Sequence, residues 1–589
     1  MIRSLLRLRV FVARYRGRLT GGIAAFALAR VFEALIPLML MVGIDRLKEG
    51  NPDLLAPALG IVAAVCARFV TVSFARMAVR RAGLLVAFDL RQRLYSHLQL
   101  MGPNFFGRYT IGDMMTRAVA DIGLIQRLIS HGTILSVILL FASVVGFSFM
   151  FALSWQLTLL IFPPLPFIFL YAWKASRRMG LASRAVQGRL SELGAHVQEN
   201  LSGIRTIQAM AQEHNEIARF GGTNQRYADA FHHQARLNSR MSAVMPTLAA
   251  LCSVGILGYG GHLVLTERLT VGEFTAFFLY VNMVVQPFRV AGFVVNLFQR
   301  AAVASDRLFD VFDRAAEIED APDTAAPAHI AGDVSVRHLD FAYEGAAGKA
   351  LADVSLDIPR GESITVMGRV GAGKTTLLKQ LVRILDTPSG TVFIDGTDVR
   401  DYPLAQLRAQ VAMVPQDPFL FGEPVRQNLS YDDPERALDL VWQAAEAADF
   451  RSTVEEMPEG METVVGERGV TLSGGQKQRA TLARGLIRHA PVLVLDDCFS
   501  SVDTETEEHI LSELRRLRRG KTTILVSHRV STARHSDRIV ILENGSIGEV
   551  GTHDELLASG GFYAELERIQ REGADASDYA AAAGARALA

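Results

Sequence analysis

The sequence predicts two parts: an α-helical membrane domain of six spans and an α/β domain of the phosphate-loop (P-loop) kind. Apolar stretches long enough to cross a bilayer recur through the first 300 residues and then stop. A glycine-rich phosphate-binding sequence at 368–375 lies among alternating predicted strands and helices in the second half. The chain has 589 residues, half of them hydrophobic, which is too long for one core and suits a protein that is part membrane and part soluble.

The N-terminal segment, residues 1–18, is basic and amphipathic. Six arginines alternate with leucine, valine and phenylalanine. This pattern favours an interfacial helix lying along the inner leaflet of the membrane. A signal peptide is the alternative, but the apolar stretch that follows is too long for one and has no clear small-residue cleavage site.

The membrane domain, residues 19–312, is predicted to hold six spans. The apolar stretches lie at residues 20–44, 54–75, 133–153, 157–173, 243–265 and 274–298. The long connections, 76–132 and 174–242, are rich in arginine, so the positive-inside bias places them and both termini in the cytoplasm. Apolar residues at helical spacing predict that the membrane helices extend into the cytosol and reverse near 112–121 and 212–220.

Three charged residues fall inside the first two predicted spans. Arg30 and Glu33 are three apart and share one face of a helix, and Arg68 lies in the second span. Ionisable groups in lipid are costly and usually face a cavity or another helix. A substrate pathway and structural pairing between helices both fit these residues.

The second half divides into a linker, a folded domain and a tail. Residues 313–332 contain two prolines with alanine and aspartate, which indicates a linker. Strands and helices alternate through residues 333–570, and residues 571–589 form an alanine-rich tail.

The phosphate loop follows a predicted strand at 364–367 and opens a helix, which is the context that the motif requires. Its glycines let successive backbone N–H groups converge on phosphate oxygens. Lys374 reaches the β and γ phosphates, and the Thr375 hydroxyl ligates Mg²⁺. The predicted ATP-binding residues of this loop are Gly368, Arg369, Val370, Gly371, Ala372, Gly373, Lys374, Thr375 and Thr376.

Two further motifs follow the phosphate loop in the chain. One is an apolar strand at 492–495 that ends in Asp496 and Asp497. The other is the pentapeptide Leu472, Ser473, Gly474, Gly475 and Gln476. The three motifs in this order resemble the ATP-binding-cassette (ABC) family, and six spans with two long helical connections resemble its exporter type.

This resemblance implies that the chain binds ATP and Mg²⁺. The implied Mg²⁺ ligands are Thr375, Gln416 and Asp496. Tyr343 matches the aromatic residue that stacks on adenine, and His528 matches the histidine beside the γ-phosphate. Ser501 and Asp503 match the loop that contacts the opposite subunit, called the D-loop.

In the resembling family, the pentapeptide caps ATP that is held by a second cassette. A chain with one cassette and six spans must then dimerise. The implied catalytic residues are Asp497, His528 and Gln416, but the family has Glu where this chain has Asp497. Displacing a catalytic group by about 1 Å costs on the order of 100-fold in rate, so we expect slow hydrolysis at this chain's own site.

A weak site beside an intact pentapeptide resembles the degenerate-site subunit of bacterial heterodimeric multidrug exporters. The implied partner is a second half-transporter. His528 is present, however, so a slow homodimer is also compatible with the sequence.

The expected function is ATP-driven export of lipophilic or amphipathic compounds, drugs or lipids, across the cytoplasmic membrane. A regulatory or channel-like ATP-binding subunit is the alternative from another class. Lysine plus arginine and aspartate plus glutamate both number 61, which gives no support for a nucleic-acid partner. The three cysteines show no disulfide or metal-binding pattern.

Overall fold

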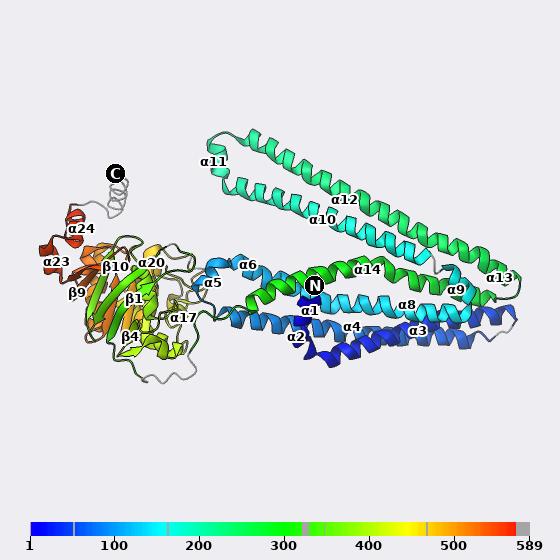
Figure 1. Cartoon of the computed structure of the whole chain (residues 1–589), viewed down its shortest axis with the longest axis horizontal. Helices are drawn as coiled ribbons and strands as arrows, with labels where there is room; N and C mark the ends of the chain where they lie inside the picture. The colour runs from blue at the N-terminus through cyan, green and yellow to red at the C-terminus, as the bar shows by residue number, and fades with distance from the viewer. Residues whose placement is uncertain are drawn as a thin grey trace. The chain divides into compact units, whose positions relative to one another are not determined.

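The computed structural model describes residues 2–572 apart from 51–52, 162–163, 321–328, 347, 467–468 and 470. The described chain forms two compact units. One comprises Met1–Gln99 with Thr110–Arg314, and the other comprises Leu100–Tyr109 with Ala315–Ala589. A short piece from the first half of the sequence therefore belongs to the second unit (Figure 1).

The membrane unit consists of long helices. The N-terminal segment forms two short ones, α1 (Ile2–Arg7) and α2 (Arg9–Ala13). The helices that follow are α3 (Arg16–Lys48), α4 (Leu55–Leu98), α6 (Ile111–Thr116), α7 (Ile122–Arg127), α8 (Thr133–Leu153), α9 (Trp155–Ile161), α10 (Pro164–Ser202), α11 (Ile204–Ala209), α12 (Glu213–Gly255), α13 (Gly261–Leu265) and α14 (Val271–Phe312). Short π-helical turns lie at Arg117–Asp121, Leu128–Gly132 and Ile256–Gly260.

Each predicted span coincides with helix in the described residues. Within the part of the chain that the structure describes, three helical segments are long and apolar enough to cross a membrane: Arg16–Lys48, Leu55–Leu98 and Ile111–Leu153. Two shorter apolar helices, Ser253–Leu265 and Val271–Val284, lie in the last two predicted stretches. Residues 162–163 of the fourth stretch are outside the described residues.

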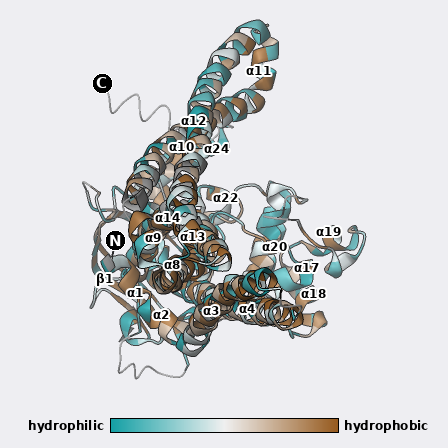
Figure 2. Ribbon diagram, turned by 90° about the vertical axis from the view of Figure 1, so that its right-hand side faces the viewer, coloured by the Kyte–Doolittle hydropathy of each residue, from teal (hydrophilic) through white to brown (hydrophobic). Residues whose placement is uncertain are grey.

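The long connections are helical, as predicted, but they reverse at other residues. The first reverses at 99–110 rather than 112–121, because the extended Gly102 ends the helical path and Pro103 starts α5 (Pro103–Arg108). The second reverses around α11, after Gly203, rather than at 212–220. The α10–α12 hairpin forms the long arm in Figure 1, and Figure 2 shows hydrophilic residues mixed with hydrophobic ones around α11.

Helix α5 is held within the second unit by Glu317. The carboxylate of Glu317 accepts hydrogen bonds from the backbone N–H of Phe105 at 2.6 Å and of Asn104 at 3.3 Å. A side chain at Gly102 would collide with the same carboxylate. Arg108 of α5 also pairs with Glu344 at 2.8 Å.

The second unit contains two sheets. The antiparallel sheet has the order β2-β1-β4-β5, and the larger sheet has the order β10-β9-β3-β8-β7-β6. In the larger sheet, β9 to β6 run parallel and β10 pairs antiparallel at one edge. The strands are β1 (Val334–Phe341), β2 (Leu351–Ile358), β3 (Ser363–Gly368), β4 (Val392–Ile394), β5 (Thr397–Asp398), β6 (Val411–Val414), β7 (Val492–Asp496), β8 (Thr522–Val526), β9 (Arg538–Glu543) and β10 (Ser546–Gly551).

The register of the parallel strands places three chain segments at one sheet edge. Val366 of β3 and Asp496 of β7 both pair with Val526 of β8. The residues that follow these strands therefore emerge together at their carboxyl ends, where open α/β sheets bind ligands.

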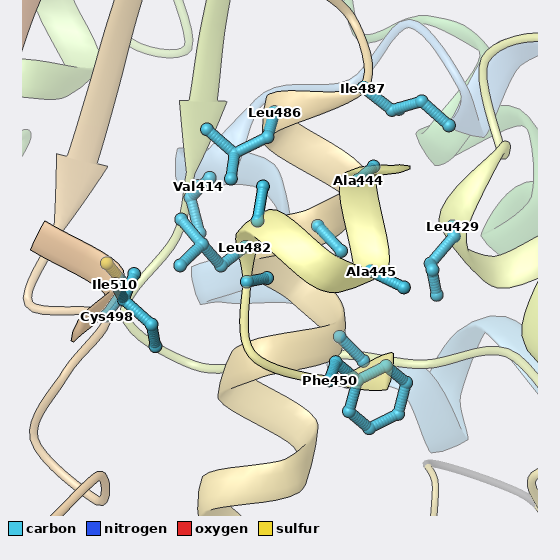
Figure 3. Packing of buried hydrophobic residues seen from close by; sticks show 14 of the residues in the cluster. Val414, Leu429, Ala444, Ala445, Phe450, Leu482, Leu486, Ile487, Cys498 and Ile510 are labelled. Carbon is cyan, nitrogen blue, oxygen red and sulfur yellow. The ribbon is translucent and has the colours of Figure 1, made fainter. Parts of the chain in front are cut away.

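Helices cover the sheets. They are α15 (Lys374–Leu381), α16 (Leu404–Gln410), α17 (Val425–Leu429), α18 (Leu438–Ala447), α19 (Arg451–Glu455), α20 (Gly474–Leu486), α21 (Thr504–Leu517), α22 (Val530–Ala533), α23 (His553–Ser559) and α24 (Phe562–Arg571), with 3₁₀ turns at Val399–Asp401 and Gly460–Glu462. Figure 3 shows how α18 and α20 share a core with β6, in which Val414, Phe450 and Leu482 are buried. A side chain at Gly485 would strike Val414, so this glycine lets α20 lie close to the strand.

Candidate functional site

The phosphate loop joins the end of β3 to the start of α15. Gly368 and Gly373 have φ of 142° and 99°, in the region that favours glycine. A side chain at Gly368 would strike the carbonyl of Leu542, and one at Gly373 would lie 2.5 Å from the carbonyl of Ala350. These two glycines are therefore required by backbone conformation and by space, which fixes the shape of the loop.

The first residues of α15 face the end of β7. Lys374 is buried and donates to the carbonyls of Gly368 at 2.9 Å and Arg369 at 3.0 Å. Burial lowers the pKa of Lys374, while the charges of Asp497 and Asp496 oppose that shift. The Thr375 hydroxyl donates to Asp496 at 3.0 Å. A hydroxyl and a carboxylate thus converge at the start of the helix.

Most of the predicted ATP-binding and catalytic residues line one cavity of about 330 Å³. That volume falls within the range of small-molecule sites, roughly 300–1,000 Å³. Gly368 and Arg369 are not among the lining residues, but their carbonyls hold Lys374 in place. The cavity is lined by Tyr343, Ala350, Val370, Gly371, Ala372, Gly373, Lys374, Thr375, Thr376, Gln416, Asp496, Asp497, Val526 and His528.

Asp497 lies directly after β7, on the cavity wall. Its φ of 46° is left-handed, a conformation that Asp tolerates better than most residues. Burial raises the pKa of Asp497 to about 6 and the charge of Asp496 adds to the shift, while a 3.3 Å hydrogen bond from Gln416 opposes it. A carboxylate with a pKa close to neutral is suited to accept a proton.

His528 lies on the same wall, and its loop is held by a residue that the sequence did not single out. Burial lowers the pKa of His528 to about 4, and the charge of Lys374 adds to this. The side-chain amide of Gln570, in α24, donates to the carbonyl of His528 at 2.7 Å and accepts from the N–H of Val530 at 2.8 Å. No motif marks Gln570, because its contact with this loop depends on how α24 packs.

Tyr343 is placed beside the phosphate loop. Its hydroxyl is 3.0 Å from the Thr376 hydroxyl, and its ring meets Phe341 edge-on at 5.2 Å. The ring therefore lines the cavity, with its orientation set by contacts to Thr376 of α15 and Phe341 of β1. The stacking role expected from the resemblance remains a prediction.

The pentapeptide lies away from this cavity, at the start of α20. Ser473 caps the helix: its hydroxyl accepts from Gln476 N–H at 3.3 Å, and the Gln476 side chain accepts from Ser473 N–H at 2.9 Å. Leu472 packs against the core beneath. A side chain at Gly475 would lie 2.8 Å from the carbonyl of Ser501, whereas one at Gly474 would make only ordinary contacts at 3.7 Å.

The D-loop is tied to this helix from within the same chain. Gln478 of α20 accepts from the N–H of Ser501 at 2.9 Å and donates to the Ser500 hydroxyl at 2.8 Å. Asp503 accepts from Thr506 N–H at 2.9 Å and caps α21, which lowers its pKa. Gln478 thus joins the pentapeptide helix to the D-loop, and sequence reasoning missed this residue.

In the membrane unit, the three charged residues of the predicted spans do come together. Arg30 pairs with Glu33 at 2.5 Å, and Arg68 of α4 donates to the other oxygen of Glu33 at 3.3 Å. Arg30 is 9% exposed.

A long-helix membrane unit joined to a phosphate-loop unit with these motifs defines an ABC-type transport ATPase. Two family models match the chain: "ABC transporter transmembrane region" over residues 19–288 and "ABC transporter" over residues 351–500. The chain belongs to the ABC transporter family. It is an ABC exporter with transmembrane and ATP-binding domains, and it couples ATP hydrolysis to transport.

Several relatives match over nearly the whole chain. A probable multidrug resistance ABC transporter ATP-binding/permease protein of Bacillus subtilis, YheI, is 33% identical, with 97% of this chain and 98% of that protein covered. An ATP-dependent lipid A-core flippase of Chromohalobacter salexigens is 31% identical, covering 97% and 98%. The solved structure of a bacterial Atm1-family ABC exporter with ATP bound matches with a TM-score of 0.77 and 25% identity, covering 94% and 99%.

Proposed function

We propose that this chain is one half of a dimeric exporter of lipophilic or amphipathic compounds, and that its own ATP site hydrolyses slowly. The observation that carries the proposal is Asp497 on the cavity wall, at the position where the family has Glu. Asp carries the same charge on a side chain shorter by one methylene, so its reach to an attacking water is reduced. The other residues of the cavity are those that ATP binding requires.

Within this site, each side chain has a defined task. The loop amides and Lys374 bind the phosphates, and Tyr343 stacks on the adenine ring. Asp497 accepts a proton from the attacking water, to which its pKa of about 6 is suited. His528, with a pKa of about 4, is neutral at physiological pH and donates a hydrogen bond to the γ-phosphate.

The donor set fits Mg²⁺. The ion prefers oxygen ligands, and the Thr375 hydroxyl and the Asp496 carboxylate lie 3.0 Å apart at the start of α15, with Gln416 on the same wall. These three residues would hold Mg²⁺, which neutralises charge on the β and γ phosphates.

The pentapeptide acts on ATP held by the second subunit. None of its five residues lines this chain's cavity, and they lie at a helix N-terminus, where backbone N–H groups favour an anion. Ser501 and Asp503 belong to the same surface and contact the partner. Because the pentapeptide is intact and Asp497 is short, the favoured partner is a different half-transporter, and a homodimer is the second possibility.

The proposed setting is the cytoplasmic membrane. The arginine-rich connections, the ATP-binding unit and both termini lie in the cytoplasm. The named activities of the relatives, multidrug resistance and lipid A-core flipping, support amphipathic or lipophilic substrates for this chain too. Arg30, Glu33 and Arg68 belong to the pathway that these substrates take.

The assembly is tested with the purified full-length chain in lipid nanodiscs. We expect the chain alone to bind ATP with little turnover, and co-purification with its partner half-transporter to restore turnover. Robust hydrolysis by the chain alone, with native mass spectrometry showing two copies, would instead establish a homodimer. Transport of a fluorescent amphiphile into inside-out vesicles separates an exporter from a regulatory or channel-like subunit.

A further inference from the structure

We infer that the cluster formed by Arg30, Glu33 and Arg68 binds the anionic head group of an acidic amphiphile, such as a phosphate or carboxylate. The inference rests on the proposed export function and narrows its substrate class. It begins from the geometry of the cluster: one carboxylate lies between two guanidinium groups, with contacts at 2.5 Å and 3.3 Å. Glu33 can neutralise only one of the two cations.

The remaining charge lies deep in the predicted spans. Arg30 is fourteen residues from the end of the stretch at 20–44, and Arg68 is fourteen residues from the start of the stretch at 54–75. At 1.5 Å per residue, both lie about 20 Å from the ends of the two apolar stretches that face the connecting loop. The cluster therefore lies well inside the hydrocarbon region, which is about 30 Å thick, where an unneutralised cation is unfavourable.

Other arginines add positive charge near Arg30. The negative charge of Glu33 stabilises the charged guanidinium of Arg30, whereas the positive charges of Arg68 and Arg76 repel it. The Nε atoms of Arg30 and Arg68 and the Oε2 atom of Glu33 are buried and have no hydrogen-bond partner among the described residues. A guanidinium has five N–H donors, so the cluster keeps donors available for an acceptor.

An anionic head group matches these donors. Guanidinium groups bind phosphate and carboxylate through paired hydrogen bonds, and these charge-assisted bonds are about twice as strong as neutral ones. Arg68 is the accessible member, since its side chain is 41% exposed. Val65, three residues before Arg68 on the same face of α4, is an exposed apolar side chain that would meet the acyl chains of the amphiphile.

Purely structural pairing predicts a different response to mutation. If the cluster only joined α3 to α4, removing either Glu33 or Arg68 would weaken the helix contact and leave ligand selectivity unchanged. If it binds an anion, the two changes have opposite effects on affinity. Glu33→Gln leaves more positive charge, and Arg68→Gln leaves less.

The test uses the full-length chain in detergent micelles and two fluorescent probes with identical short acyl chains, a phosphatidylglycerol and a phosphatidylcholine. We expect phosphatidylglycerol to bind at least about tenfold more tightly, because both head groups carry a phosphate but only phosphatidylcholine carries a choline cation, which the two arginines repel. Arg68→Gln should reduce that preference about tenfold, whereas Glu33→Gln should increase it. Arg46→Gln, which removes an arginine near the end of α3 where it pairs with Asp53, should change nothing.

Equal affinity for the two probes would overturn the inference, as would parallel losses of affinity in both variants. The half-exposed Arg68 is chosen because Arg30 is buried and its loss could prevent folding. Thermal unfolding of each variant shows whether it is folded. Export is measured separately: selective binding without ATP-dependent movement of the probe would refute the proposed export function and leave the binding site in place.

Discussion

Replacing Asp497 with Glu tests the proposed slow site directly. The substitution adds one methylene and extends the carboxylate by about 1.5 Å, a typical carbon–carbon bond length. If only reach limits hydrolysis, correcting a displacement of about 1 Å restores up to about 100-fold in rate, which corresponds to about 2.7 kcal/mol.

The backbone reduces that gain. Asp497 has a φ of 46°, and a left-handed conformation costs most residues about 1 kcal/mol that Asp largely avoids. Glu will therefore occupy the productive geometry less often. We expect hydrolysis to rise by about 10- to 100-fold, with little change in ATP affinity.

The assay is single-turnover hydrolysis of ATP in a dimer whose other site has been disabled. Asp497→Asn should remove the residual activity, and Asp554→Glu, an exposed Asp of α23, is the matched control that should leave the rate unchanged. An unchanged rate in Asp497→Glu, with the partner's pentapeptide intact, would show that reach is not what limits this site.

Three other predictions follow from contacts near the site. Gly475→Ala should lower the apparent melting temperature of the full-length chain, because the alanine side chain would press on the carbonyl of Ser501 in the D-loop at a cost on the order of 1–3 kcal/mol. Gly474→Ala is the control and should leave the melting temperature unchanged, because its side chain would make only ordinary contacts. Gln570→Leu should slow hydrolysis about tenfold at unchanged ATP affinity, because two hydrogen bonds to the His-bearing loop are lost, and normal turnover would argue against this positioning role. Asp497→Asn should raise the melting temperature of the nucleotide-free chain at pH 7.5, because the pKa of Asp497 is about 6 in the folded chain against an ordinary 3.8, so ionisation of this carboxyl disfavours the folded state. This gain in melting temperature should disappear as the pH falls from 6 to 4. A gain that does not depend on pH would contradict the raised pKa of Asp497.

The fold was largely predictable because its signals are local in sequence. Long apolar stretches predict spans wherever they occur, and a phosphate loop between strand and helix predicts its own surroundings. The reversal points were predicted wrongly by about ten residues. Residues 111–116, within or beside the first predicted reversal, form a helix capped by Thr110, whereas the chain turns at Gly102 and Pro103.

The residues of the candidate site that belong to recognisable motifs were predictable from the sequence. The phosphate loop, Gln416, Asp497 and His528 meet in the cavity because the parallel strands β3, β6, β7 and β8 end at one side of the sheet, which strand order determines. Gln570 and Gln478 could not be found this way. Each acts on backbone groups of a distant loop, and a glutamine in a helix looks the same in sequence whether it faces solvent or a neighbouring loop.

The boundary between the two units does not follow the linear order of the sequence, because helix α5 lies in the first half of the sequence but belongs to the second unit. Leu100–Tyr109 belongs to the ATP-binding unit, where Glu317 accepts its backbone N–H groups and Glu344 pairs with Arg108. Recombination between two related genes at the linker alone would join α5 from one parent to Glu317 and Glu344 from the other. A chimera that inherits its ATP-binding unit intact needs three crossovers, after residues 99, 109 and 314. Exchange of whole ATP-binding units during evolution is therefore constrained more tightly than one flexible linker suggests.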